Sequence, residues 1–378
     1  MHSITTSNSL GLRILVAPLN WGLGHATRSI PIIRELLDQG AEVFLASDME
    51  AGKLLQAEFP DLPYFELSSY KVHYKTQNMV LNLAFQFPKI INTVLKEHIE
   101  IEKIVEREQI DAVITDNRFG CYSKQAYSIF ITHQVNVLIG NKLTERTVRY
   151  LNRKFMDRFD EVWIPDYEGT PNLSGVLAHG IKKGEFTYLG PLSRMKEKPN
   201  TGAYDLAVIL SGPEPQRTYL ERKILPQLVN FDGKVVLVRG KADAEALDMY
   251  SDHLEIHNFC KSKELNEIIA ASDVILSRSG YSTVMDLAKM GKKSIMIATP
   301  GQSEQEYLAK MLSEANIIHS ETQQDFDLQR AMTAVENTSG FDARIFEDND
   351  LAKVINQFLE KIMAGLNERG DRTSKREN

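Results

Sequence analysis

The sequence is poor in cysteine and has no long apolar run. Its two cysteines, Cys121 and Cys260, lie far apart and form no Cys-x-x-Cys pattern, which argues against structural disulfides and against zinc. No apolar stretch approaches the roughly 18 residues of a membrane span. The first ten residues lack the basic and apolar regions of a signal peptide. These absences favour a cytoplasmic protein.

Basic residues are outnumbered by acidic residues. The chain has 44 lysines and arginines against 51 aspartates and glutamates, a net charge of −7, so nucleic acid is not expected as its main partner. The hydrophobic fraction of 43% is typical of a globular protein. At 378 residues the chain exceeds the size at which one hydrophobic core stops growing, and two domains are expected.

Short apolar, β-branched segments alternate with helical periods, which predicts βαβ units on parallel sheets. In the first half the expected strands are Ile14–Ala17, Glu42–Ala46, Ala112–Thr115, Ser128–Thr132 and Glu161–Ile164, with helices at Ile30–Gln39 and Ile90–Arg107. In the second half they are Leu206–Leu210, Lys234–Val238, Leu254–His257, Val274–Leu276 and Ser294–Ile297, with helices at Arg217–Leu228, Lys263–Ala270, Thr283–Met290 and Gln305–Ser313.

A polar run rich in proline and glycine, from Gly190 to Gly202, separates the two halves. We expect a first Rossmann-like domain over residues 10–192 and a second over 203–345. A last amphipathic helix, residues 346–366, is expected to cross back onto the first domain. The charged tail over residues 367–378 is expected to be disordered.

The loop after the first expected strand carries two glycines and a histidine. Gly22 and Gly24 allow a ligand to approach the backbone closely, and His25 titrates near neutrality at the same place. One interpretation is a dinucleotide-binding loop with Asp48 on the ribose, but the third glycine of that fingerprint is absent. The other is a glycine loop on the acceptor side of a transferase, with His25 as a catalytic group.

A second strand–loop–helix segment lies in the second domain, from Ser277 to Leu287. Gly280 permits a tight turn, Ser282 or Thr283 can cap the following helix, and Asp286 shares a helix face with Thr283. A pyrophosphate is favoured at such a helix N-terminus, and Asp286 can accept hydrogen bonds from ribose hydroxyls. The alternative is an ordinary capped helix that binds no ligand. A further loop, Ala298 to Ala309, opens a helix whose polar side chains suit sugar hydroxyls.

Together these loops, Ser-Arg-Ser-Gly-x-Ser-Thr-x-x-Asp from Ser277 and then Pro-Gly and Gln-Glu-Tyr, resemble the donor site of GT-B glycosyltransferases. The resemblance is to the family of the lipid-linked muropeptide N-acetylglucosaminyltransferase, over roughly residues 12–320. It implies an α/β GT-B fold, with two Rossmann-like domains, a cleft between them and a C-terminal helix that crosses back.

The resemblance also implies roles for individual residues. Asp286, where the family usually has Glu, would bind the ribose of UDP, and Gln305 and Glu306 would contact the donor sugar. Arg194, in Gly190-Pro-Leu-Ser-Arg194, would touch the diphosphate, although the proline stands one place early. Gly22, Gly24 and His25 match the family's loop in the first domain and would face the acceptor and the transferred sugar. The remaining candidates for donor binding are Arg278, Ser279, Gly280, Ser282 and Thr283.

One loop departs from the family. Where a glycine-rich loop is usual, this chain has Leu210-Ser-Gly-Pro-Glu-Pro-Gln-Arg217, and its two prolines remove backbone donors. Ser211, Gly212 and Arg217 are left as candidate phosphate contacts, with the arginine able to replace lost N–H groups. Phe259 is a candidate to stack near the uracil, or a core aromatic residue.

No metal and no cofactor is expected. The two Asp-x-Asp matches, Asp325–Asp327 and Asp348–Asp350, follow the last core strand and are interpreted as helix caps. The helix N-terminus and arginines would then stabilise the leaving diphosphate.

The predicted reaction is transfer of a sugar from a UDP-sugar, with UDP-N-acetylhexosamine as a candidate, to a hydroxyl acceptor activated by His25 or Asp116. The acceptor is a glycan, a lipid-linked molecule or a small molecule, and peripheral contact with the inner face of the plasma membrane is compatible with it. Asn117-Arg118 and His133-Gln134 either hold loops together or touch the acceptor. The alternatives are a nucleotide-sugar hydrolase of the same fold and a non-catalytic sugar-nucleotide-binding protein.

Overall fold

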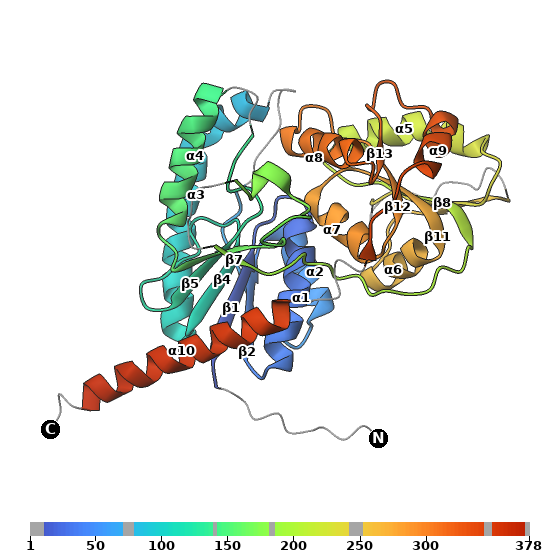
Figure 1. The fold of residues 1–378 in the computed structure, drawn as a ribbon. Coiled ribbons are helices and arrows are strands. Elements are labelled where there is room, and N and C mark those ends of the chain that lie inside the picture. The colour runs from blue at the N-terminus through green and yellow to red at the C-terminus, as the bar shows by residue number, and fades with distance from the viewer. Residues whose placement is uncertain are drawn as a thin grey trace, which may run out of the picture. The chain divides into compact units, whose positions relative to one another are not determined.

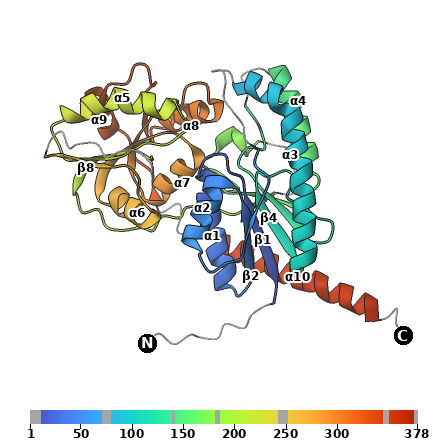
Figure 2. The ribbon, with the colours of Figure 1, turned by 180° about the vertical axis from the view of Figure 1, so that it is seen from behind.

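The computed structural model describes residues 11–70, 79–138, 142–180, 186–241, 252–343 and 350–374. The chain divides into two compact units. The described residues of the first come from 11–172, 176–192 and 350–374, and those of the second from 173–175 and 193–343. Each unit has its own parallel sheet with helices, so the predicted α/β class with two Rossmann-like domains is confirmed (Figures 1 and 2).

The first unit has a seven-stranded parallel sheet in the order β3-β2-β1-β4-β5-β6-β7. Its strands are β1 Arg13–Pro18, β2 Glu42–Ser47, β3 Tyr64–Glu66, β4 Ala112–Asp116, β5 Tyr127–Ile131, β6 Glu161–Ile164 and β7 Phe186–Tyr188. Its helices are α1 Gly24–Asp38, α2 Met49–Glu58, α3 Met79–Glu108, α4 Lys142–Met156 and α10 Asp350–Ser374, and the 3₁₀ turn η1 Gly175–Leu177 belongs to it except for Gly175.

The second unit has a six-stranded parallel sheet in the order β10-β9-β8-β11-β12-β13. Its strands are β8 Tyr204–Ile209, β9 Val235–Val238, β10 Leu254–His257, β11 Ser272–Ser277, β12 Lys293–Met296 and β13 His319–Ser320. Its helices are α5 Gln216–Val229, α6 Ser262–Ala270, α7 Tyr281–Lys289, α8 Ser303–Glu314 and α9 Leu328–Glu336.

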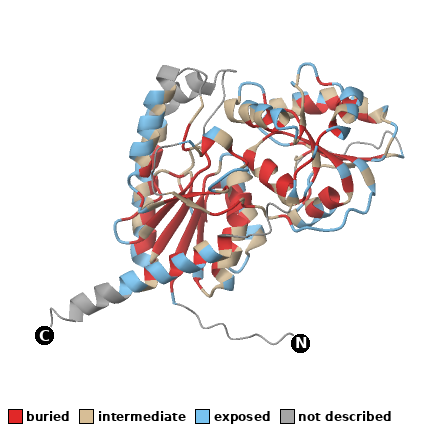
Figure 3. Cartoon of the chain, in the orientation of Figure 1, coloured by how far each residue is buried: buried red, intermediate tan, exposed pale blue. Residues whose placement is uncertain are grey.

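The central strands are buried on both faces, which explains why they are continuous apolar runs rather than alternating ones. Ile14 and Leu15 of β1 are fully buried, and β1 pairs with β2 on one side and β4 on the other. Figure 3 shows this burial across the strands of the first sheet. The apolar stripe of α1 packs as its spacing predicts, with Ile30, Ile33 and Leu36 fully buried.

The elements that the sequence analysis did not list are three short edge strands and the helices α2, α4 and α9. β3, β7 and β13 have two or three residues each, and most of these are only partly buried, so they lack an apolar run. Helix α4 was missed because most of its residues are polar or charged. In a chain of this class such elements are positioned by the sheet they flank rather than by their own pattern.

The last helix, α10, packs on the first unit. Gln39, which follows α1, donates a hydrogen bond to the carbonyl of Ala352, and Lys361 pairs with Glu161 at 2.6 Å. Figure 1 shows α10 beside the ends of β1 and β2 at which these strands begin. The helix continues to Ser374, so residues 367–374 are helical and not disordered as predicted. Residues 375–378 lie outside the described residues.

Within the described parts of the chain, we find no helix with the length and apolar character needed to cross a bilayer.

Phe358 anchors α10, and its truncation tests this packing. Its ring is 4% exposed and meets Trp163 edge to face, with ring centroids 5.3 Å apart. We expect Phe358→Ala to destabilise the first unit by about 3–5 kcal/mol. Leu366→Ala, at a position 38% exposed, is the control and should change stability by about 0.5 kcal/mol or less. Both tryptophans belong to the first unit, so tryptophan fluorescence during denaturant unfolding measures it. Equal effects of the two variants would contradict the packing of α10.

Candidate active site

The same strand order creates one switch point in each sheet. In the first unit, chain order reverses between β1 and β4, and in the second between β8 and β11. Open α/β sheets bind ligands at the carboxyl ends of the strands beside such a point. Gly22, Gly24 and His25 follow β1, and Asp116 ends β4. In the second unit, Gly212 follows β8 and Gly280 follows β11.

The switch point of the first unit brings His25 and Asp116 into contact. His25 Nδ1 lies 2.8 Å from Asp116 Oδ1, and the two side chains are 15% and 1% exposed. The sequence analysis named the two residues as alternative bases, whereas the structure pairs them. Gly22 makes this possible with a φ of +79°, which turns the chain from β1 into α1 just before His25.

Arg28, one turn further along α1, holds Asp116 from the other side. Its Nε and Nη2 atoms donate to the two carboxylate oxygens, and its Nη1 lies 3.0 Å from His133 Nδ1. Arg28 is 3% exposed and His133 4% exposed, so this is a buried network. Sequence reasoning missed Arg28; its only signal was the position three residues after His25 on the same helix face.

Together, burial and the neighbouring charges lower the pKa values of both His25 and Asp116. Burial lowers the pKa of His25, as does Arg28, while Asp116 opposes them. For Asp116, burial alone would raise the pKa, but the charges of Arg28 and His25 outweigh it and hold the pKa at about 2. At neutral pH the network therefore contains an ionised Asp116 and a neutral His25.

The proton of His25 is assigned to Nδ1. Asp116 Oδ1 and Arg28 Nη2 both lie 2.8 Å from this nitrogen. An ionised carboxylate can only accept, and Arg28 Nη2 already donates to Asp116, so an Nδ1–H bond to Asp116 is the favoured arrangement. Nε2 then carries a lone pair, and no residue among those the structure describes is recorded as bonding to it. An imidazole oriented in this way by a carboxylate can act as a general base.

A second buried network beside it is structural. Arg118 is fully buried, pairs with Glu97, and donates to Asp48 Oδ1 at 3.0 Å and to the carbonyl of Ser68 at 3.0 Å. Tyr70 donates to the other oxygen of Glu97 at 2.8 Å. Asp48 is thus committed to Arg118, which argues against its role as the ribose acid of a dinucleotide site. Arg118 holds loops together rather than facing an acceptor.

In the second unit, helix α7 points its N-terminus at the switch point. Gly280 is its N-cap residue, so no side chain caps the helix there, and the predicted caps Ser282 and Thr283 do not take that role. Ser279 is buried and donates to the carbonyl of Gln305 at 2.8 Å, which joins the loop after β11 to the start of α8. A Cβ on Gly280 would lie 4.0 Å from Gln305 Nε2. The loops carrying Gly280 and Gln305 are therefore neighbours, as the donor-site interpretation requires.

Asp286 and Arg194 also come together, through Ser193. Ser193 donates to Asp286 Oδ1 at 2.6 Å, and the charge of Arg194 acts on Asp286. Burial raises the pKa of Asp286 to about 6, against the opposing effects of Arg194 and Ser193. Arg194 donates through Nη1 to Ser262 at 2.9 Å, while its buried Nε atom has no hydrogen-bond partner. Ser193 was not anticipated, because nothing in its local sequence distinguishes it.

Two arginines predicted to bind the donor make hydrogen bonds to other parts of the protein. Arg278 is 1% exposed and donates to the carbonyls of Ala298 and Gln216 and to the side chain of Gln323. Arg217 donates to the carbonyl of Gly240 and pairs with Glu214 at 2.9 Å. Both guanidinium groups therefore connect loops at the carboxyl ends of the strands. This is a structural role that residue type alone does not distinguish from phosphate binding.

The other candidates lie on the surface of the second unit. Ser211 and Gly212 are exposed, and a Cβ on Gly212 would lie 3.6 Å from the buried, unpaired Thr299 Oγ1. Glu306 is exposed and accepts from the amide of Gly301 at 2.9 Å. Phe259 is 43% exposed, which excludes the core alternative.

The structure describes the predicted cap of only one of the two Asp-x-Asp matches in full. Asp327 is the N-cap of α9 and accepts from the amide of Arg330 at 2.9 Å, so its predicted capping role is confirmed. Asp348 lies outside the described residues.

Comparisons with known proteins show which proteins the chain resembles. Residues 215–362 match the glycosyltransferase family 28 C-terminal domain. A relative in Haemophilus ducreyi, named UDP-N-acetylglucosamine–N-acetylmuramyl-(pentapeptide) pyrophosphoryl-undecaprenol N-acetylglucosamine transferase, is 21% identical over 297 residues, which are 75% of this chain and 78% of that protein.

Two solved structures show the fold. MurG of Acinetobacter baumannii aligns over 93% of this chain and 99% of its own, with a TM-score of 0.56 and 14% identity. The glycosyltransferase SnogD from Streptomyces nogalater aligns over 93% and 96%, with a TM-score of 0.60 and 14% identity. Two Rossmann-like units and these likenesses lead to one conclusion: the chain is a glycosyltransferase of the GT-B fold, and its residues 215–362 match the glycosyltransferase family 28 C-terminal domain.

Proposed function

We propose that the chain transfers a sugar from a UDP-sugar to an acceptor hydroxyl, with His25 as the general base. The observation that carries this proposal is the contact of 2.8 Å between His25 and the buried carboxylate of Asp116. The choice of UDP-N-acetylhexosamine as donor is supported by the printed name of the Haemophilus ducreyi relative, which contains UDP-N-acetylglucosamine.

In the proposed reaction, the acceptor oxygen attacks the anomeric carbon of the donor sugar while His25 Nε2 takes its proton. The bond between that carbon and the diphosphate oxygen breaks, and UDP leaves with the electron pair. Asp116 keeps the imidazole in the required tautomer and stabilises the imidazolium that forms. Arg28 keeps Asp116 ionised throughout, because both of its donor atoms face the carboxylate.

The second unit is proposed to hold the donor. The N-terminus of α7, behind Gly280, offers backbone N–H groups and a partial positive charge to the diphosphate, and Arg194 adds a full charge. Asp286 would accept from ribose hydroxyls, and Gln305 and Glu306 would contact the sugar. These groups are proposed to stabilise the leaving diphosphate without a divalent cation, by fixed dipoles and charge.

Replacement of His25 tests the role of the base. We expect His25→Gln to lower kcat by about 10²–10⁴-fold while the affinity for UDP stays within a few-fold, because the base acts on the acceptor. His179→Gln is the matched control: it removes another partly buried histidine of the first unit, whose Nε2 lies 3.2 Å from Asp166. UDP release, with and without candidate acceptors, measures both variants.

A similar loss of kcat in both variants would contradict the assignment of the base to His25. UDP release that proceeds at full rate without any acceptor and disappears in His25→Gln would show a nucleotide-sugar hydrolase instead.

The pH dependence of donor binding tests Asp286. Its pKa of about 6 means that the carboxyl gains a proton as the pH falls through that value and loses acceptor capacity for the ribose. We expect affinity for UDP-N-acetylglucosamine to fall by up to about tenfold per pH unit below about pH 6. Asp286→Asn should bind more weakly at neutral pH and lack this dependence, while Asp273→Asn, an exposed aspartate of the same unit, should retain it. Calorimetric titration measures the affinities; the same pH profile in Asp286→Asn would contradict the role.

We propose that a lipid-linked acceptor is reached by peripheral contact of the first unit with the cytoplasmic face of a membrane. The support is helix α4, which exposes Tyr150 and Leu151 beside Arg149 and Arg153. Aromatic and apolar side chains among basic residues suit an anionic lipid surface. The name of the Haemophilus ducreyi relative includes a pyrophosphoryl-undecaprenol acceptor, which is consistent with this surface.

Charge reversal on α4 tests the contact. We expect the chain to sediment with vesicles that contain anionic lipid, and Arg149→Glu with Arg153→Glu to weaken this binding by about 10–100-fold, because each basic residue contributes about 1 kcal/mol. The control carries the same change of charge at two exposed lysines on other helices, Lys53→Glu with Lys310→Glu. Equal binding by the two double variants would contradict the assignment to α4.

A further inference from the structure

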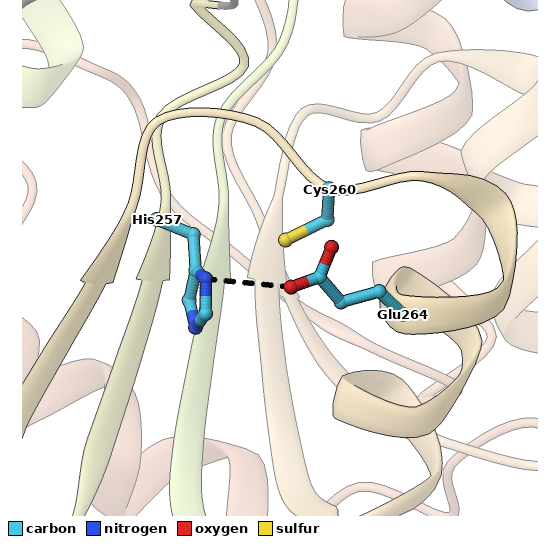
Figure 4. A group of neighbouring side chains, drawn as sticks. All are labelled: His257, Cys260 and Glu264. Carbon is cyan, nitrogen blue, oxygen red and sulfur yellow. Dashed lines mark ion pairs between the residues drawn. The ribbon is translucent and has the colours of Figure 1, made fainter.

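Three side chains with different metal-binding atoms meet at the end of β10, in the second unit. His257 is the last residue of β10, Cys260 lies in the following loop and Glu264 is in the first turn of α6. Their ligand atoms, one nitrogen, one sulfur and one oxygen, all lie within 4.8 Å of one another. Figure 4 shows the thiol and the carboxylate directed into the same space beside the imidazole.

The distances suit a small metal ion. A tetrahedral ion with bonds of about 2.0–2.3 Å needs ligand atoms about 3.3–3.8 Å apart. His257 Nδ1 and Glu264 Oε1 are already 3.6 Å apart. The third ligand atom needs only a small rotation of the Cys260 or Glu264 side chain, because no pair exceeds 4.8 Å.

A carboxylate on the far side of the imidazole orients the ring so that it can bind a metal ion. His257 Nε2 lies 2.6 Å from Glu255 Oε1, so Nε2 carries the proton and Nδ1 presents its lone pair to Cys260 and Glu264. Tyr204 in turn donates to the other oxygen of Glu255. A carboxylate behind a ligating histidine is the usual outer support of protein metal sites, where it fixes the tautomer and strengthens the ligand.

The thiol of Cys260 is buried beside the other two side chains. Cys260 is 6% exposed, and its sulfur lies within 4.8 Å of ligand atoms of His257 and Glu264. A divalent ion that binds here displaces the thiol proton to solvent and forms a metal–sulfur bond, with no change of oxidation state.

We propose that His257, Cys260 and Glu264 bind a divalent transition-metal ion of the zinc class. Imidazole and thiolate ligands select such an ion over magnesium or calcium, and three protein ligands leave a fourth position for water. Glu264 is 49% exposed, which gives the ion a route from solvent. The sequence analysis argued against zinc from the cysteine pattern alone. This site needs only one cysteine, so that argument did not find it.

The bound ion would fix the loop that carries Phe259. This loop joins β10 to α6, and α6 begins with Ser262, the partner of Arg194. The proposal does not rest on the glycosyl-transfer reaction, and it concerns a site outside the residues assigned to that reaction.

Cobalt serves as the probe because its thiolate complexes absorb visibly. We expect the full-length protein, stripped with a chelator and titrated with Co²⁺, to bind one ion with a thiolate-to-cobalt charge-transfer band and to release one proton. Zn²⁺ should then displace the cobalt and abolish the band. Cys260→Ser should lose the band although Cys121 is still present.

His257→Gln and Glu264→Gln should each weaken Co²⁺ binding by at least about tenfold. The matched control is His319→Gln, in which another histidine of the second unit loses its contact with a glutamate two residues away, Glu321 at 3.1 Å. A wild-type protein without the band, a band retained in Cys260→Ser, or equal binding by His257→Gln and His319→Gln would each overturn the proposal. His257→Gln and Glu264→Gln keep the test valid if Cys260→Ser does not fold.

Discussion

The carboxylate of Asp116 is the group on which the proposed catalytic arrangement depends. It is almost fully buried, where an unpaired charge would be strongly destabilising, and Arg28 makes it tolerable by donating to both oxygens. The same carboxylate accepts from His25 and so fixes its tautomer. Because Arg28 and His25 lie one turn apart on α1, the start of one helix supplies both the counter-charge and the base.

The two units share one sheet topology, and we propose a different role for each: proton transfer in the first and donor binding in the second. Each contains the strand order 3-2-1-4-5-6, which β7 extends in the first unit, with a switch point between its first and fourth strands, and each places a glycine loop there. In the first unit the neighbouring strand ends in a carboxylate, which suits the proton transfer that we propose for this site. In the second unit the helix after the switch begins with Gly280, and the nearby charges are Arg194 and a weakly acidic Asp286, which suits a diphosphate and a ribose.

The sequence predicted what depends on local pattern. Apolar segments located most of the strands, and Glu161–Ile164 and Leu254–His257 at their observed bounds. The pairing of His25 with Asp116 joins residues 91 positions apart and follows from the adjacency of β1 and β4, which no local pattern contains. For the same reason Arg278 was interpreted as a donor-binding residue, although its guanidinium group is bound to backbone carbonyls from other loops.

The tautomer of His25 is the most direct test of the account. Nitrogen-15 NMR of protein labelled in its histidine side chains, with His25→Gln used to assign the signal, reports which ring nitrogen carries the proton and the pH at which the second proton binds. The account predicts a proton on Nδ1, an unprotonated Nε2 at neutral pH, and a pKa below the 6.5 of an unperturbed histidine. A proton on Nε2 at neutral pH, with Nδ1 accepting from Arg28, would leave the ring unable to act as the base and would contradict it.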